Sequence, residues 1–143
     1  MERKTELRRR AWILASAYLV LIFGLSSIPQ GTLSKAVFKV SDKLAHLAEY
    51  SGLGLLLTVA FRRTLRGARR WVLTVVVVVA GAIVGALDET YQLTVPGRDT
   101  DLLDWAADVL GVLVGNGVSM AFRTWRIARQ GQNRRRSERG RVV

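Results

Sequence analysis

Four long apolar runs divide the chain, and short polar or charged stretches separate them. The runs cover residues 11–28, 44–61, 71–87 and 105–122. A helix needs about 20 predominantly apolar residues to cross a bilayer, with a range of roughly 17 to 25. Only helices and closed barrels satisfy their backbone in lipid, and these runs are too long and unbroken for alternating barrel strands. The pattern therefore predicts an all-α, membrane-embedded bundle of four transmembrane helices.

Basic residues are distributed unequally between the two sides of these predicted spans. Residues 1–10, the loop at 62–70 and residues 123–143 carry eighteen of the 22 Lys and Arg residues, against three acids. The other two loops hold the remaining four cations, which are Lys35, Lys39, Lys43 and Arg98. Because short cytoplasmic loops are enriched in Lys and Arg, we expect both termini and the second loop to be cytoplasmic. The first and third loops then face outward.

The same charge pattern divides the chain into three parts. We predict a basic cytoplasmic N-terminal segment at 1–10, a transmembrane domain at 11–122 and a basic cytoplasmic tail at 123–143. The tail lacks apolar periodicity after Ile127, which predicts disorder. The first apolar run is longer than the roughly 7–15 residues of a signal-peptide core, so we interpret it as an uncleaved helix.

Composition narrows the classes of function and partner. The 143 residues carry a net charge of +11 and include no cysteine, which excludes disulfides, thiolate metal sites and cysteine nucleophiles. Such a charge suggests either nucleic acid or an anionic membrane surface. The arginines flank the predicted spans, and no stacking aromatics interleave with the tail. We therefore expect anionic lipid headgroups at the cytoplasmic face as the partner, and no nucleic acid.

Acidic residues gather near the outward ends of the third and fourth predicted helices. Six of the eleven acids fall within one short stretch, and they are Asp88, Glu89, Asp99, Asp101, Asp104 and Asp108. A turn at Pro96-Gly97 divides this stretch.

Two glycine pairs lie on the helix faces that carry these acids. Glu89 continues the face of the GAIVG sequence at 81–85, and Asp104 and Asp108 continue the face of the GVLVG sequence at 111–115. This glycine spacing lets helices approach closely. We therefore expect the third and fourth helices to pack through the two pairs and to bring the carboxylates together.

The second helix adds polar residues at the same predicted depth. Asp42, His46 and Glu49 or Tyr50 form one stripe of that helix. A charged residue within a span costs about 2.5–3.5 kcal/mol on insertion scales, so it normally faces a partner or a water-filled cavity. Glu49 and Asp108 lie deepest in their predicted spans, so a carboxylate without a partner or function is hardest to explain at these two positions. The sequence therefore predicts a polar pocket that opens to the outside.

Several members of this set also have simpler structural interpretations. Asp88 and Asp104 could be interfacial loop residues, and Asp42 could be the N-cap of the second helix. His46 could be a hydrogen-bonded packing residue, because a lone histidine is weak evidence for catalysis. Arg98, the only cation of the third loop, could simply neutralise its acidic neighbours.

Arg98 is also the residue that we expect to organise the pocket. Because many outward acids face this one nearby arginine, the sequence predicts a partly dehydrated ion pair between Glu49 and Arg98. We expect Asp104 or Asp108 to share the cation.

Three motifs occur together in the order that is typical of a known family. They read SDKLAHLAEYSGLG, DETYQLTVPGR and DLLDWAADVLGVLVG. From about Ser26 to Gly115 the chain resembles the VanZ-like family of small bacterial integral membrane proteins. The resemblance implies a multi-pass protein of the bacterial cytoplasmic membrane and cell envelope. The family's namesake is associated with resistance to the glycopeptide antibiotic teicoplanin.

The resemblance also implies which residues form the pocket. The family's polar signature falls on His46, Glu49, Tyr50, Asp88, Glu89, Gln92, Arg98 and Asp104. Asp108 joins them through the cost of burying a charge in the membrane, and it stands where the family often has Asn. These nine residues are our candidate binding site. No catalytic residue, metal ligand or cofactor is assigned.

Three classes of function fit such a pocket. The first, which we favour, binds or modifies an outer-leaflet lipid-linked or cell-wall molecule. The second is a metal-assisted enzyme that uses His46 and carboxylates, although the chain lacks the H-E-x-x-H and G-x-S-x-G motifs. The third is a proton-coupled carrier, which needs a homo-oligomer because four helices are few for one carrier. The acids of the pocket would repel a phosphate group. A phosphorylated ligand would therefore need Arg98 or a bridging cation in order to bind, whereas a ligand with an amine would need neither.

Overall fold

The computed structural model describes residues 2–29, 42–98 and 100–139, with the side chains of residue 42 and of residues 134–139 left out. These residues form four helices, and they contain no strand. The helices are α1 (Glu2–Ser26), α3 (Asp42–Thr64), α4 (Arg70–Gln92) and α5 (Leu102–Arg139). Within the described residues, all four are long and apolar enough to cross a membrane. The predicted all-α class and the four membrane-like helices are confirmed.

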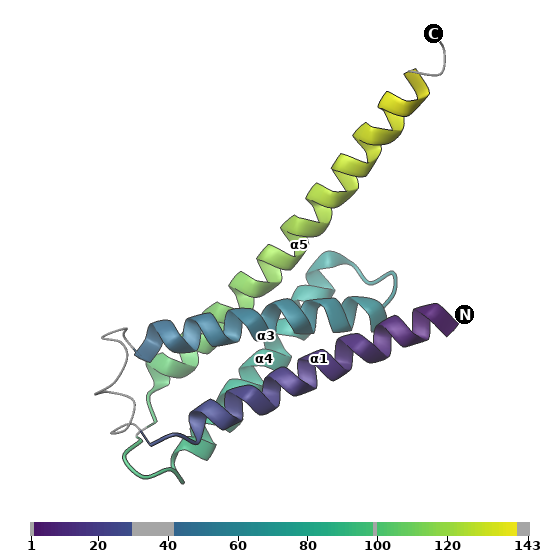
Figure 1. Cartoon of the computed structure of the whole chain (residues 1–143). Helices are drawn as coiled ribbons and strands as arrows, with labels where there is room; N and C mark the ends of the chain where they lie inside the picture. Colours follow the sequence, from purple (N-terminus) through teal and green to yellow (C-terminus); the bar gives the residue numbers. More distant parts are fainter. Residues whose placement is uncertain (1, 30–41, 99, 140–143) are drawn as a thin grey trace.

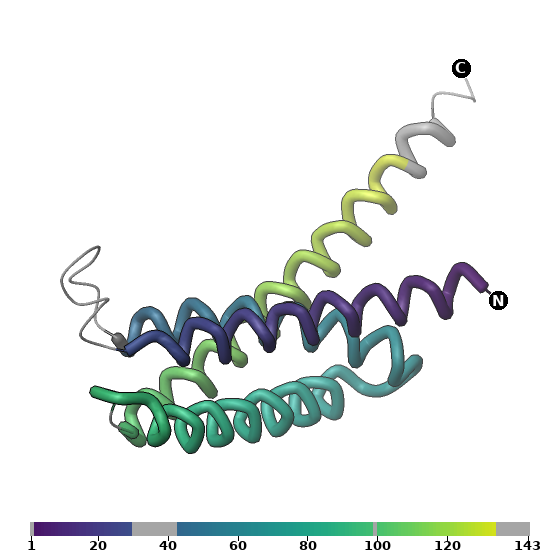
Figure 2. The backbone as a smooth tube through the Cα atoms, turned by 60° about the horizontal axis from the view of Figure 1, so that its bottom comes forward, coloured from purple at the N-terminus to yellow at the C-terminus, as the bar shows by residue number. Residues whose placement is uncertain are grey.

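Helix α3 is the centre of the bundle, because it contacts α1, α4 and α5 (Figure 1). Tyr50, Leu53 and Leu57 of α3 form the core together with Val77 of α4 and Val112 of α5. Tyr50, Leu53, Val77 and Val112 have no exposed surface. The first part of α5 packs against the other helices, and its later part diverges from the bundle in both views (Figures 1 and 2).

The two glycine pairs serve two different helix contacts. A Cβ atom at Gly81 would lie 2.5 Å from a methyl group of Val112, so the α4 pair does face α5 as expected. A Cβ atom at Gly111 would lie 2.5 Å from the carbonyl oxygen of Leu47, and one at Gly115 would meet the carbonyl of Ser51. The α5 pair therefore contacts α3, and the prediction that both pairs join the same two helices is wrong.

The helical period explains this correction. Val112 faces α4, while Gly111 faces α3. Adjacent residues of a helix are about 100° apart around its axis, since one turn takes 3.6 residues. A one-residue offset is therefore enough to turn the glycine face of α5 away from α4 and toward α3.

Both basic ends are helical, and the tail differs from its sequence-based interpretation. Residues 2–10 form the first turns of α1, and α5 continues as a helix past Ile127 to Arg139, where we had predicted a disordered tail. Arg, Gln and Ala have high helix propensity, and this segment contains no proline. Extending an existing helix costs far less than nucleating a new one, so the helix continues after its apolar residues end.

The elements place opposite charges at the two ends of the bundle. The start of α1 and the turn between α3 and α4 lie at one end, which we call the basic end (Figure 1). The ends of α1 and α4 and the starts of α3 and α5 lie at the opposite end, which we call the acidic end (Figure 1).

Orientation in the membrane can be tested with single cysteines, because the natural chain has none. Ala68 and Thr100 are exposed at the basic and acidic ends. Ala68 is a better site than Gly67, whose φ of +86° disfavours a side chain. With the basic end cytoplasmic, an impermeant thiol reagent should label Thr100→Cys in intact cells and should label Ala68→Cys only after lysis. Labelling of Ala68→Cys alone in intact cells would reverse the orientation.

Candidate functional site

The acidic end brings together polar side chains from three helices. We call the inner group the acidic site, and its members are His46, Glu49 and Tyr50 from α3, Asp88 and Glu89 from α4, and Asp108 from α5. Five of the six are buried, and Glu49 is half-buried. Buried ionisable groups normally need a partner in so apolar an environment. The contacts of each member therefore decide what the site can do.

His46 and Asp108 join α3 to α5 at the centre of this group. Nδ1 of His46 lies 2.8 Å from Oδ1 of Asp108, and it donates to the carboxylate when the ring proton is on Nδ1. His46 is 5% exposed and Asp108 is fully buried. Gly85 of α4 allows Asp108 to approach, because a Cβ atom at that position would lie 2.9 Å from Oδ2. A larger residue at Gly85 would therefore displace the carboxylate.

Asp88 connects the site to α1. Its Oδ2 accepts hydrogen bonds from Oγ of Ser26 at 2.9 Å and from Nε2 of Gln92 at 3.1 Å. Asp88 has no exposed surface. Ser26 is the last residue of α1, so this bond fixes the end of that helix against α4 beside the acidic site.

Glu89 connects the site to the loop before α5. Its Oε2 accepts a hydrogen bond from the backbone N–H of Asp101 at 3.1 Å. Asp101 in turn accepts a bond from Nζ of Lys43 at 2.6 Å, and Asp104 accepts one from the same Nζ at 2.8 Å. Lys43 holds the pKa of the Asp101 carboxyl below its usual range. That interaction therefore stabilises the fold fully above the ordinary pKa of an Asp carboxyl, and it is lost as the pH falls through the lowered pKa of Asp101 in the folded protein.

Arg98 does not form the ion pair with Glu49 that the sequence suggested, as far as the described residues show. Its Nε donates to the backbone carbonyl of Ile28 at 3.3 Å. Within the described part of the chain Arg98 forms no ion pair, so the predicted pair with Glu49 is not found there. Asp104, expected to share Arg98, pairs with Lys43. Lys43 lies three residues before His46 on the same face of α3, which puts its ammonium within reach of the start of α5.

Four buried oxygen atoms of the acidic site have no hydrogen-bond partner in the described structure. They are the Tyr50 hydroxyl, Asp88 Oδ1, Glu89 Oε1 and Asp108 Oδ2. An unsatisfied buried polar group typically costs about 1–3 kcal/mol, and a charged one costs more. No Lys or Arg of the described residues forms an ion pair with these carboxylates. The arrangement therefore suits a cation or a hydrogen-bond donor that is not part of the chain.

Three members of the site also suit a metal ion. His46, Glu89 and Asp108 each offer one ligand atom, and these atoms lie within 4.8 Å of one another. Carboxylate oxygens suit Mn²⁺, and an imidazole nitrogen suits Zn²⁺, so this mixed set of ligand atoms fits either ion. The unpartnered oxygens of Glu89 and Asp108 make this donor set chemically consistent with such an ion.

Sequence analysis missed three residues that surround the site. In the sequence Lys43 is one of the cations of the first loop. Its three-residue spacing from His46 indicates that both lie on the same face of one helix. Asp101 was one of many loop acids, and its contacts with Lys43 and Glu89 depend on the path of the loop. Ser26 carried no signal, because its contact with Asp88 joins residues 62 positions apart. Asp42 and Asp99 belong to the predicted acidic group, but the side chain of Asp42 and all of Asp99 lie outside the described residues.

Removing the charge of one buried carboxylate of the acidic site should stabilise the folded protein when no ligand or divalent ion is present. Asp108→Asn keeps an acceptor oxygen for His46 and replaces the unpartnered oxygen with an amide donor. We expect the free energy of unfolding to rise by about 1–3 kcal/mol, measured by chemical unfolding in detergent. The matched control is Asp101→Asn, which weakens the contact with Lys43 and should lower stability. A loss of stability in Asp108→Asn would mean that the cluster is already satisfied.

Comparison with known proteins places the chain in a family. No curated protein and no solved structure matches it significantly. The family model described as VanZ/LLP1 matches residues 4–123, which cover α3, α4, all but the first two residues of α1 and the part of α5 up to Arg123. The acidic site lies entirely within the matched region. The chain belongs to the VanZ/LLP1 family.

Proposed function

We propose that this VanZ-like membrane protein binds a cationic group of an outer-leaflet lipid-linked or cell-wall molecule. The observation that supports the proposal is the set of buried, unpartnered carboxylate oxygens on Asp88, Glu89 and Asp108. An ammonium group has three donors and a positive charge, so one such group could bind Glu89 and Asp108, which each offer a ligand atom within 4.8 Å of the other. The acidic site thereby serves as the recognition element of a binding protein.

The proposal includes an orientation. The basic end faces the cytoplasm, where short loops retain Lys and Arg, and the acidic site faces the outer leaflet of the bacterial cytoplasmic membrane. A cell-wall molecule carried on a lipid reaches the protein from that leaflet. Its apolar carrier can remain in the bilayer while its polar part reaches the end of the bundle.

An amine fits this end better than a phosphate does. Glu49, Asp88, Glu89 and Asp108 would repel a phosphate group. The two described cations nearby are already engaged, Lys43 with Asp101 and Asp104, and Arg98 with the carbonyl of Ile28. A phosphorylated ligand would therefore need a bridging cation, whereas an amine needs none.

The direct test is binding of a lipid-linked cell-wall precursor that carries a free amine on its peptide. The comparison ligand is the same precursor acetylated at that amine. With protein in lipid nanodiscs, we expect acetylation to weaken binding about tenfold to hundredfold, the range for a lost charge-assisted hydrogen bond. Glu89→Gln should lose this preference. In a susceptible host, that variant should also lose any rise in the inhibitory concentration of teicoplanin that the natural chain gives.

The control is Glu6→Gln, which removes an acid at the basic end that is paired with Arg9 and Arg10. This variant should keep the preference for the free amine. Equal affinity of the natural chain for both precursors would contradict recognition of the amine.

A second candidate function is metal-assisted chemistry, which the His46, Glu89 and Asp108 geometry favours. In that case these residues would hold a divalent ion, and the ion would polarise a substrate oxygen or activate water. Chelators distinguish the two candidates in the same binding assay. Amine recognition is insensitive to a chelator, whereas a metal site loses binding with the chelator and regains it when Mn²⁺ is added.

A further inference from the structure

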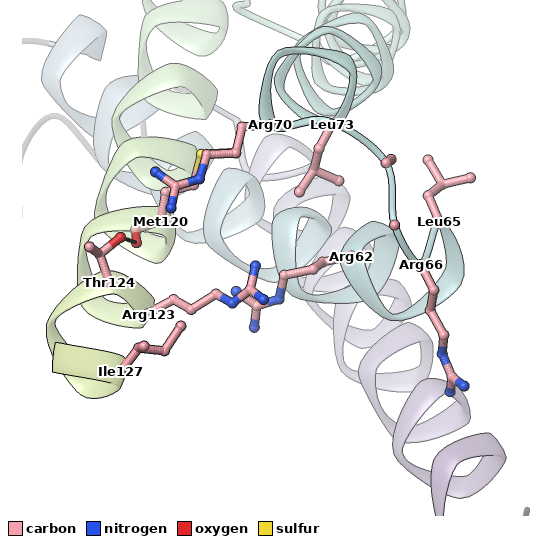
Figure 3. Close-up of a pocket in the computed structure, with 11 residues that line it drawn as sticks. Arg62, Leu65, Arg66, Arg70, Leu73, Met120, Arg123, Thr124 and Ile127 are labelled. Atoms are coloured by element: carbon pink, nitrogen blue, oxygen red, sulfur yellow. Dashed lines mark hydrogen bonds between the residues drawn. The ribbon is translucent and has the colours of Figure 1, made fainter. Parts of the chain in front are cut away.

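A cavity lies at the basic end of the bundle, at the opposite end from the acidic site. It has a volume of about 350 Å³ and lies between the end of α3, the start of α4 and the later part of α5 (Figure 3). Arg62, Arg66, Arg70 and Arg123 line it together with apolar side chains such as Met120. This concentration of arginine around one cavity indicates a site for an anion.

The arginines in this cavity lack acidic partners. Arg62 of α3 and Arg123 of α5 extend toward each other (Figure 3), and Arg62 is half-buried. Among the described residues, neither one forms an ion pair, and neither does Arg70. Arg66 differs, because it points away and donates to backbone carbonyls of Arg63 and Lys4. Like charges held this close repel each other unless an anion lies between them.

The start of α4 contributes to the same positive region. The helix begins at Arg70, and its N-cap residue, Arg69, makes no side-chain capping bond. The first turn of α4 contains no acid. The first amides of a helix have no partner within the helix and carry a partial positive charge, which favours an anion there. Arg70 and Leu73 of this first turn line the cavity.

An apolar groove adjoins this cavity and extends between α3 and α5. Its volume is about 620 Å³, and it shares Arg62 and Arg123 with the cavity. Val59 of α3 and Val118 and Phe122 of α5 form part of its wall. Val118 and Phe122 are more than half exposed. A charged end continuous with an apolar channel matches a molecule that has an anionic head and a hydrocarbon chain.

We propose that an anionic phospholipid occupies these two spaces as a bound lipid. Its phosphate lies between Arg62, Arg123 and the start of α4, and one acyl chain lies in the groove against Val118 and Phe122. This is a defined binding site between α3 and α5, where the later part of α5 diverges from the bundle. It goes beyond a general attraction of basic loops to anionic membranes, and it is independent of the function proposed for the acidic site.

Thermal unfolding of delipidated protein in nonionic detergent tests this site. The probes are phosphatidylglycerol, phosphatidylcholine and inorganic phosphate, each titrated separately. Phosphatidylglycerol should raise the unfolding temperature, and phosphatidylcholine should have little effect. In the double variant Arg62→Gln/Arg123→Gln, the half-maximal concentration of phosphatidylglycerol should rise roughly 30-fold, from the usual contribution of two surface cations. The matched control is Arg8→Gln, an exposed arginine of α1, which should bind like the natural chain.

Two further variants keep the test decisive if the double glutamine variant does not fold. Arg62→Lys/Arg123→Lys preserves the charges and should retain most of the response. Val118→Trp fills the groove and should weaken phosphatidylglycerol binding while leaving the effect of phosphate unchanged. An unchanged phosphatidylglycerol response in Val118→Trp would overturn the proposal. An equal rise in unfolding temperature with phosphatidylcholine would also overturn it, and so would the full rise with inorganic phosphate alone. Either result would mean that an anionic lipid is not required.

Discussion

The hydrogen bond between His46 and Asp108 is the interaction on which the acidic end depends. It connects α3 to α5 through two buried side chains. Around it, Asp88 binds the end of α1, and Glu89 binds the loop before α5. Each carboxylate thus uses one oxygen to fix a structural element and leaves its other oxygen without a partner. The residues that hold the helices together at this end are also those available to a ligand.

These carboxylates both hold the helices together and leave an oxygen available to a ligand, which explains why buried acids are present in membrane-like helices despite their energetic cost. A purely structural polar contact would be satisfied on both sides, as in the network of Thr58, Thr74 and Asn116 nearer the centre of the bundle. There, Asn116 donates to Thr58 at 2.9 Å and accepts from Thr74 at 3.1 Å. The acidic site lacks that completeness. Sites that hold unfavourable charge for function commonly reduce stability in return.

Sequence reasoning was strongest where one physical constraint dominated. Unpaired backbone groups are costly in lipid, so each of the four apolar runs was predicted to form a helix. The cost of burying charge selected Glu49 and Asp108, and hydrogen bonds and burial place Asp108 at the centre of the acidic site. Helix periodicity placed His46 on one stripe of α3 with Glu49 or Tyr50, and the side chains of His46 and Tyr50 are buried in the bundle.

It was weaker where the outcome depended on geometry between elements. The glycines of α5 face α3 because of a one-residue offset that pattern alone could not assign to a partner. Asp104 forms its ion pair with Lys43 and not with Arg98, because the start of α3 lies beside the start of α5. The tail remained helical because propagation needs no apolar face. The first two errors concern which neighbour a residue meets, and sequence spacing does not determine that. The third concerns how far a helix extends beyond its apolar residues.

We propose that the acidic site receives a cationic group beside His46. This histidine is the only one in the chain, so selective ¹⁵N-histidine labelling gives ring signals that belong to a single residue. In nanodiscs, the account predicts that these signals move when a lipid-linked precursor with a free amine is added. They should remain in place with the N-acetylated precursor. Unchanged ring signals at saturating concentrations of the free-amine precursor would contradict the account.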